Sequence, residues 1–184
     1  FWLSQNEEGN GMIVMAQGLQ VKIISTPEIA AEIAAISDIS DCYAYTYQKY
    51  QHTFVVFTFP SGGKTIVFDT TLQMFHTWKS KTLGYHRSTG HTFIYGKHLV
   101  GDPTNGRIYE LDWDSNTDNG DVIERRRIST TFHADDKGID WDVLELDIKE
   151  GVGGINRSKV KIITTGVSQF VQSISLTDTN GDFI

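Results

Sequence analysis

Residues 42–79 read CYAYTYQKYQHTFVVFTFPSGGKTIVFDTTLQMFHTWK, and this stretch decides the fold class. It holds four runs rich in β-branched and aromatic residues, at 42–50, 52–59, 64–69 and 74–79. Short polar or Gly-containing connections separate the runs, whereas a parallel crossover needs a dozen or more residues. The stretch therefore predicts one four-stranded antiparallel sheet.

Strand patterns of the same kind continue along the rest of the chain, so we expect an all-β protein. The further strands are expected at 11–16, 19–24, 84–88, 91–95, 98–101, 106–112, 122–133, 141–150, 158–165 and 169–177. One segment differs, because Ser25-Thr26-Pro27-Glu28 precedes Ile29, Ile33 and Ile36 with Ala between them. An N-cap, an early Pro and apolar residues three to four apart predict a short helix at about 27–36.

Two weak internal repeats favour a β-propeller. His52-Thr53-Phe54 recurs 39 residues later as His91-Thr92-Phe93, and Gly63…Val67-Phe68-Asp69 recurs 43 residues later as Gly106…Glu110-Leu111-Asp112. Propeller blades are four-stranded antiparallel sheets that repeat every ~40 to 50 residues. We therefore expect propeller-like blades, with a sandwich or barrel as the alternative. Because His52 and His91 fall at equivalent places in this repeat, we expect both to be structural.

The chain is expected to be a fragment of a larger propeller. It begins at Phe1-Trp2-Leu3 without an initiator Met, and about 45 residues per blade leave room for about four blades at most. Incomplete blades expose unpaired strand edges, which we expect at residues 1–3 and 169–177.

Composition narrows the function classes. Against 16 Lys and Arg stand 23 Asp and Glu, and the net charge of −7 disfavours binding to a polyphosphate backbone. The single Cys42 cannot form an internal disulfide and lies in an apolar run, where Cys acts as a small hydrophobe. No apolar stretch approaches the ~18 residues of a membrane helix. We expect neither direct sequence-specific nucleic-acid binding nor a membrane segment.

Motifs that resemble ligand sites are incomplete. Ser61-Gly62-Gly63-Lys64-Thr65 lacks the first Gly of a phosphate-binding loop, because position 58 is Thr, and it lies between two strands. The acidic runs 112–118 and 178–182 lack a complete set of calcium-loop ligands. The His residues, at 52, 76, 86, 91, 98 and 133, form no metal-ligand pair.

Catalytic motifs are equally weak. The chain has no Gly-x-Ser-x-Gly nucleophile elbow, and Cys42 lacks the electropositive surroundings of a reactive thiolate. Arg125-Arg126-Arg127 lies beside acidic residues and favours a salt-bridged or subunit surface. We therefore expect no catalytic, cofactor-binding or metal-binding residues, and no enzyme activity.

Many framework residues together resemble the packaged-DNA stabilisation proteins of short-tailed bacteriophages. The likeness runs through Phe1-Trp2-Leu3-Ser4, Ile24-Ser25-Thr26-Pro27-Glu28-Ile29, Asp38 to Tyr47, His52-Thr53-Phe54, Thr58-Phe59-Pro60, Phe68-Asp69, Thr77-Trp78, Val100-Gly101-Asp102, Asn105-Gly106-Arg107-Ile108-Tyr109, Leu146-Asp147 and Gly151-Val152-Gly153. It covers about 1–154, which we expect to form the blades, whereas 155–184 depart from the family pattern and are expected to add further strands.

The resemblance implies a nonenzymatic tail accessory protein that closes the portal channel after DNA packaging, carries the tail needle and forms a ring of several copies, a hexamer. Portal-adaptor and other tail proteins would be its partners. Its place would be the virion tail, after synthesis in the host bacterial cytoplasm, and it would need no cofactor. Two alternatives remain: a generic protein-interaction propeller, and a carbohydrate-binding propeller, which the aromatic residues Trp78, Tyr85, Tyr95, Tyr109 and Trp113 favour.

Overall fold

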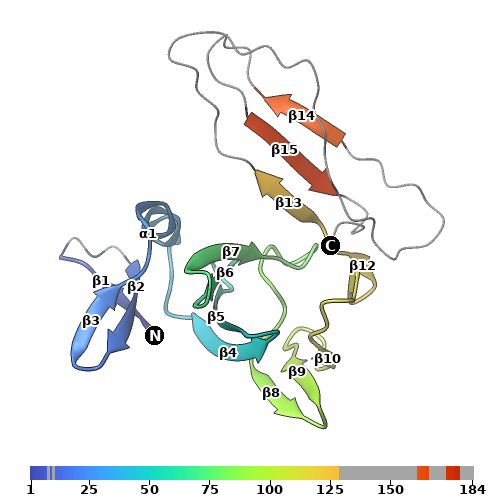
Figure 1. Cartoon of the computed structure of the whole chain (residues 1–184), viewed down its shortest axis with the longest axis horizontal. Coiled ribbons are helices and arrows are strands. Elements are labelled where there is room, and N and C mark those ends of the chain that lie inside the picture. The colour runs from blue at the N-terminus through green and yellow to red at the C-terminus, as the bar shows by residue number, and fades with distance from the viewer. Residues whose placement is uncertain (8, 10, 129–160, 166–172, 179–184) are drawn as a thin grey trace. The chain divides into compact units, whose positions relative to one another are not determined.

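The computed structural model describes residues 1–7, 9, 11–128, 161–165 and 173–178, and the chain divides into two compact units, 1–112 and 113–184. Unit 1 contains β1 (Trp2–Gln5), β2 (Gly11–Gln17), β3 (Gln20–Ile23), α1 (Pro27–Ala34), β4 (Tyr43–Lys49), β5 (His52–Phe59), β6 (Lys64–Asp69), β7 (Met74–Trp78), β8 (His91–Ile94), β9 (Lys97–Gly101) and β10 (Ile108–Glu110) (Figure 1). Unit 2 contains β11 (Thr117–Asp118), β12 (Asp121–Val122), β13 (Arg125–Ile128), β14 (Lys161–Thr165) and β15 (Ser173–Asp178).

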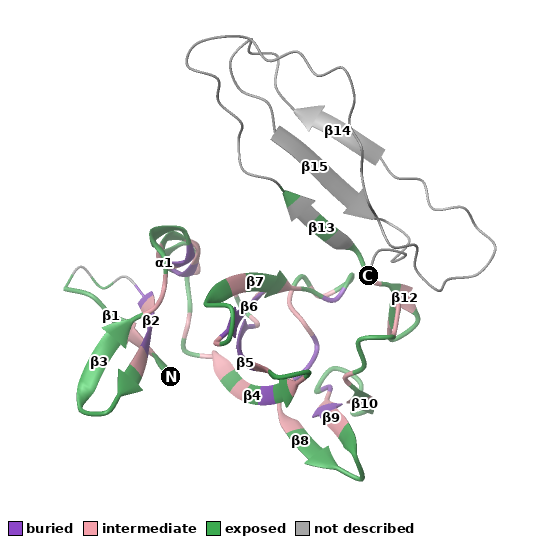
Figure 2. Cartoon of the chain, viewed as in Figure 1, coloured by how far each residue is buried: buried purple, intermediate pink, exposed green. Residues whose placement is uncertain are grey.

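The sheet predicted for 42–79 is confirmed. Its strands follow the order β4-β5-β6-β7, and each neighbouring pair is antiparallel. The central strands β5 and β6 are the most buried, with residues 54–59 and 65–69 all covered (Figure 2). A strand covered on both faces needs a continuous apolar run, as residues 54–59 supply.

One face of this sheet packs against α1 and the sheet β1-β2-β3. The shared core is formed by Ile13 of β2, Ile29 and Ile33 of α1, Val55, Phe57 and Phe59 of β5, and Ile66 and Phe68 of β6. Gly11 is required at this contact, because a Cβ there would lie 2.5 Å from Ile33 Cγ2. The absence of a side chain lets β2 approach the helix.

On the other face of the central sheet, the side chains of β4 contact the sheet β8-β9-β10. Tyr47, Phe54, Val56 and Val67 form a second core cluster on this side. The ring of Tyr47 lies 5.7 Å from that of His91 in β8 and 5.9 Å from that of His98 in β9. Three antiparallel sheets therefore follow one another along unit 1 and contact each other through these side chains, which confirms the all-β architecture of small antiparallel sheets.

The predicted helix is confirmed, at Pro27–Ala34. Thr26 is the N-cap, and its Oγ1 accepts a hydrogen bond from the backbone N–H of Ile29 at 3.4 Å. Ile29 and Ile33 are buried on one stripe, as the spacing predicted. Among the described residues, no helix has the length and hydropathy needed to span a membrane.

The strand predicted at 84–88 is wrong. The backbone there bonds to turns and side chains instead of a neighbouring strand: Tyr85 C=O accepts from Ser80 N–H, His86 N–H donates to Thr65 Oγ1, and Arg87 N–H donates to Ser80 Oγ. Apolar and aromatic content predicted a strand here because it does not show that the backbone groups of 84–88 bond to Ser80 and Thr65.

Unit 2 shows a hairpin, β11–β12, and a sheet in the order β13-β15-β14. The single strand predicted at 122–133 is two strands as far as it is described, because Ile123-Glu124 separates β12 from β13. β15 pairs with both β13 and β14 at residues 175–177, so the free edge expected at 169–177 is wrong for these residues. The strand predicted at 141–150 and the domain boundary expected at 154 lie outside the described residues.

Candidate functional site

The first polar cluster lies at the turn after β6 and is centred on Asp69. Asp69 Oδ1 accepts hydrogen bonds from the backbone N–H groups of Thr71 (2.8 Å) and Leu72 (3.2 Å). Asp69 Oδ2 lies 2.7 Å from His52 Nδ1. Burial acts to raise the pKa of Asp69, but these hydrogen bonds outweigh it and hold that pKa below its usual value.

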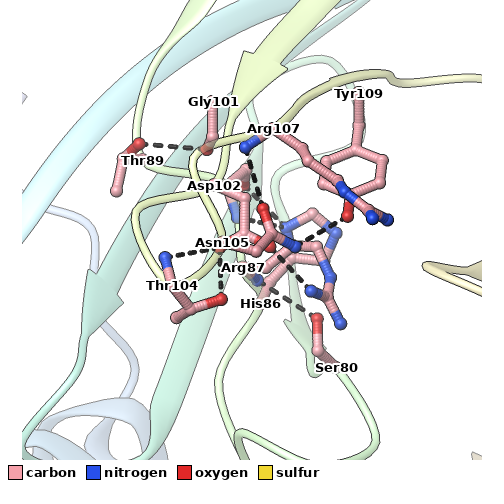
Figure 3. Close-up of polar contacts among 11 residues, drawn as sticks. Ser80, His86, Arg87, Thr89, Gly101, Asp102, Thr104, Asn105, Arg107 and Tyr109 are labelled. Carbon is pink, nitrogen blue, oxygen red and sulfur yellow. Dashed lines mark hydrogen bonds and ion pairs between the residues drawn. The ribbon is translucent and has the colours of Figure 1, made fainter.

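A second Asp occupies the turn after β9 in the same way (Figure 3). Asp102 Oδ1 accepts from the backbone N–H of Thr104 (2.8 Å) and from its Oγ1 (2.6 Å), and Asp102 Oδ2 lies 2.7 Å from Arg87 Nη1. Both side chains of this ion pair are buried. Burial acts to raise the pKa of Asp102, but Thr104 and Arg87 together lower it.

The two clusters are equivalent in their contacts. Each Asp lies at the end of the second strand of a hairpin, accepts a hydrogen bond from a turn N–H on Oδ1 and has a side-chain partner 2.7 Å from Oδ2. That partner is His52 for Asp69 and Arg87 for Asp102. In this sense the counterpart of His52 is Arg87.

Both sequence repeats therefore pair residues that are not structurally equivalent. His52 and His91 are not equivalent, and the counterpart of Asp69 is Asp102, not Asp112. Every carboxylate oxygen of Asp69 and Asp102 has a partner, so these groups brace hairpin ends. Neither Asp has a free oxygen for acid–base chemistry.

A Ser–His contact resembles a nucleophile and its base. Ser88 Oγ lies 2.6 Å from His86 Nδ1 and 2.6 Å from Tyr45 Oη. Ser88 is completely buried, so no substrate can reach it in this conformation. Burial raises the pKa of Tyr45 to about 12, although its bond with Ser88 opposes the rise. The cluster ties β4 to the 84–88 loop.

His91 and His98 form a pair that the sequence spacing did not reveal. His91 Nε2 lies 2.9 Å from His98 Nδ1, and the rings stack with centroids 5.1 Å apart. Burial, together with the charge of His98, lowers the pKa of His91, while a bond to the Thr46 backbone opposes this. Within the described ranges, no three His, Cys, Asp or Glu side chains converge on one point.

The remaining motifs have structural explanations. Gly62-Gly63 forms the β5–β6 turn, with Gly63 at φ +58°, and Lys64 Nζ lies 3.0 Å from Glu32 Oε2. Burial raises the pKa of the Cys42 thiol to about 12, which fits an unreactive Cys. Asp112 pairs with Lys49 at 3.2 Å. Arg125-Arg126-Arg127 lies in β13, as predicted, and Arg126 is exposed.

One face of the sheet β1-β2-β3 is apolar and open. The register aligns Trp2, Val14 and Ile23 in one row, Ala16 with Val21 in a second, and Ser4 with Met12 in a third. Trp2 is 39%, Val21 64% and Ile23 59% exposed, whereas Val14 between Trp2 and Ile23 is covered, at 2%. No charged residue lies on this face, which we call the open face. Among the described residues, β1 is an outer strand of its sheet, so Trp2 and Leu3 lie at an edge, as expected.

Comparison with known proteins identifies the family. A family model described as "Bacteriophage P22 Gp10, beta-propeller" matches residues 1–116, which contain all three sheets of unit 1. No curated protein matches the chain. The match covers more than half of the chain and agrees with the blade-like sheets. The chain therefore belongs to the Bacteriophage P22 Gp10 β-propeller family, a family of structural phage proteins concerned with stabilisation.

Proposed function

We propose that the chain is a nonenzymatic tail accessory protein of a short-tailed phage. In this proposal several copies, arranged as a hexameric ring in the virion tail, close the portal channel after DNA packaging and link it to the tail needle. Portal-adaptor and other tail proteins are the partners. Membership of the family supports this role, and the open face of β1-β2-β3 is the observation that carries it.

The open face favours a protein partner because it is apolar and has no charged side chains. It presents Trp2, Met12, Ala16, Val21 and Ile23 around the buried Val14, with no charged side chain among them. Contiguous exposed apolar surface marks a contact with another apolar surface. Nucleic acid would need cations here, and the chain as a whole carries a net charge of −7. We infer that the open face packs against neighbouring tail subunits.

A mechanical role also fits the polar clusters. Asp69, Asp102 and Ser88 are each bonded to neighbouring groups that hold turns and strand ends in place. Such networks give rigidity when all members are satisfied. A plug that retains DNA under pressure needs this rigidity, whereas an enzyme needs a reactive group in reach of its substrate.

The test is a phage carrying Val21→Asp in this protein, with Gln20→Asp as the matched control. Both residues are exposed on β3, but Gln20 lies on the opposite face of the sheet. Val21→Asp should give particles that package DNA and then lose it, with tail proteins missing. Gln20→Asp particles should retain their DNA. Val21→Asp particles that hold DNA and carry a complete tail would disprove the proposal.

A further inference from the structure

We propose that Asn119-Gly120 is a site of spontaneous chemical ageing, at which Asn119 loses its side-chain amide, while the fold protects Asn105-Gly106 from the same reaction. Asn is among the residues that limit the lifetime of proteins at elevated temperature. Both sequences place Gly after Asn, and Gly has no Cβ to hinder attack by its own backbone nitrogen. The inference does not depend on the proposed function.

The reaction needs only water as a co-reactant. The backbone nitrogen of Gly120 attacks Asn119 Cγ, and a C–N bond forms. The side-chain nitrogen leaves with the proton of the Gly120 amide as ammonia, which leaves a cyclic imide. Water then opens the imide at either carbonyl, giving Asp or isoaspartate at position 119.

The Asn119 site is exposed and lies in a short hairpin. Asn119 and Gly120 are exposed and form the turn of the β11–β12 hairpin, at φ +53° and φ +90°. Each strand of this hairpin has two residues, and the pair forms a sheet of its own. An isolated two-stranded hairpin is marginally stable in water, so it opens at low cost. Opening gives the backbone the freedom that ring closure requires.

The Asn105 site is held at every group that reacts (Figure 3). The attacking N–H of Gly106 donates to Asp102 C=O at 2.9 Å. Asn105 Nδ2 donates to Tyr109 Oη at 2.8 Å, and Asn105 Oδ1 accepts from Arg107 N–H at 2.9 Å. Attack requires all three hydrogen bonds to break. Asn119 reacts when a hairpin with two residues in each strand opens, so we expect the rate at Asn105 to be at least about tenfold lower than at Asn119.

Conversion of Asn119 has two physical consequences. It adds a carboxylate to a segment that already contains Asp114, Asp118, Asp121 and Glu124. Isoaspartate also adds a methylene group to the main chain in a two-residue turn, which disturbs the pairing of Thr117 with Val122. The β11–β12 hairpin should therefore be lost as the protein ages.

The test incubates the full 184-residue chain at physiological temperature and mildly alkaline pH, and follows each Asn-Gly peptide by mass spectrometry. We expect Asp and isoaspartate at 119 and intact Asn at 105. In denaturant, the rates at the two sites should become similar, because both then depend on the same dipeptide. The Asn180-Gly181 peptide lies outside the described residues and is quantified separately.

Two variants test the roles of the Asn119 side chain and of the hydrogen bond that holds Asn105. Asn119→Gly removes the reactive amide and keeps residues suited to this turn, so it should abolish conversion there. Tyr109→Phe removes the partner of Asn105 Nδ2 and should raise the rate at Asn105. Equal rates at both sites in the folded chain would overturn the proposal. So would an Asn119 that stays intact in the folded chain while both sites convert in denaturant.

Discussion

Arg87 Nη1 lies 2.7 Å from Asp102 Oδ2, and the side chains of this pair are 5% and 0% exposed. The Arg87 guanidinium group also lies over the ring of Tyr109, 5.7 Å from its centroid. The pair joins the loop before β8 to the turn after β9. The equivalent pair in the preceding sheet, His52 and Asp69, is less buried on the His side, at 28%.

Asp102→Asn should destabilise unit 1 strongly, because it leaves the buried Arg87 without its counter-charge. Removing one partner of a buried ion pair costs about 3 to 5 kcal/mol. Asp69→Asn should cost less, since His52 is partly exposed and water can replace its partner. Urea unfolding of both variants gives the comparison. Equal losses for the two variants would show that burial of the cation does not set the cost.

Stability should fall as the pH drops below 6.5, because of His91. Its pKa in the folded chain is lower than the ordinary value of 6.5, so the unfolded chain binds the proton more readily between the two values. The contribution of neutral His91 is therefore complete above pH 6.5 and declines as pH falls through its folded pKa. In the His91→Phe variant, the free energy of unfolding should therefore change less with pH in this range.

Acid should act on the two Asp clusters at a lower pH. The folded pKa values of Asp69 and Asp102 lie below the ordinary value of 3.8. Their stabilisation is complete above that value and is lost as pH falls further. His91→Phe should leave this acid-induced loss unchanged. If His91→Phe changed the pH dependence of stability both just below pH 6.5 and below pH 3.8, the assignment of these two ranges to His91 and to the Asp residues would be contradicted.

Sequence patterns predicted the elements whose signals are local. The strands at 43–78 follow from apolar runs broken by tight turns, and α1 follows from Thr26, Pro27 and the spacing of Ile29 and Ile33. These features act over a few residues, so neither needs knowledge of the tertiary fold. The open face was not foreseen as a surface, because it exists only once three strands are in register.

The side-chain clusters could not be predicted for the same reason. His52 and Arg87 correspond only because each lies against the carboxylate of an Asp at a hairpin end, and the two residue types differ, so no sequence repeat could reveal the match. The loop 84–88 has strand-like composition, yet its bonds go to Ser80 and Thr65. His91 meets His98 only because Tyr95-Gly96 makes a two-residue turn, without the Asn-Gly signature that marks such turns.

Gly11→Ala should destabilise the contact between β2 and α1. The added Cβ would lie 2.5 Å from Ile33 Cγ2, in a core cluster where Ile33 is 1% exposed. Overpacking of this kind costs about 1 to 3 kcal/mol. Gly90→Ala is the control, because a Cβ there meets nothing within 4 Å. Thermal unfolding that affects the two variants equally would argue against a steric role for Gly11.

Tyr95→Asn should stabilise the chain, although it removes an aromatic residue. Tyr95 is 90% exposed and has a φ of +54°, in the left-handed region that Asn and Gly adopt more easily than Tyr. Little buried surface is lost, and relief of the backbone strain is worth about 1 kcal/mol.

Tyr50→Asn provides the comparison for Tyr95→Asn. Tyr50 also has a left-handed φ, of +51°, but it is 63% exposed and its ring lies 5.5 Å from Lys49 Nζ. That contact is lost in the variant, so its gain should be smaller. Denaturant unfolding of both variants measures the difference. If Tyr95→Asn lowers the unfolding free energy, the Tyr95 side chain contributes more in the folded chain than its exposure indicates.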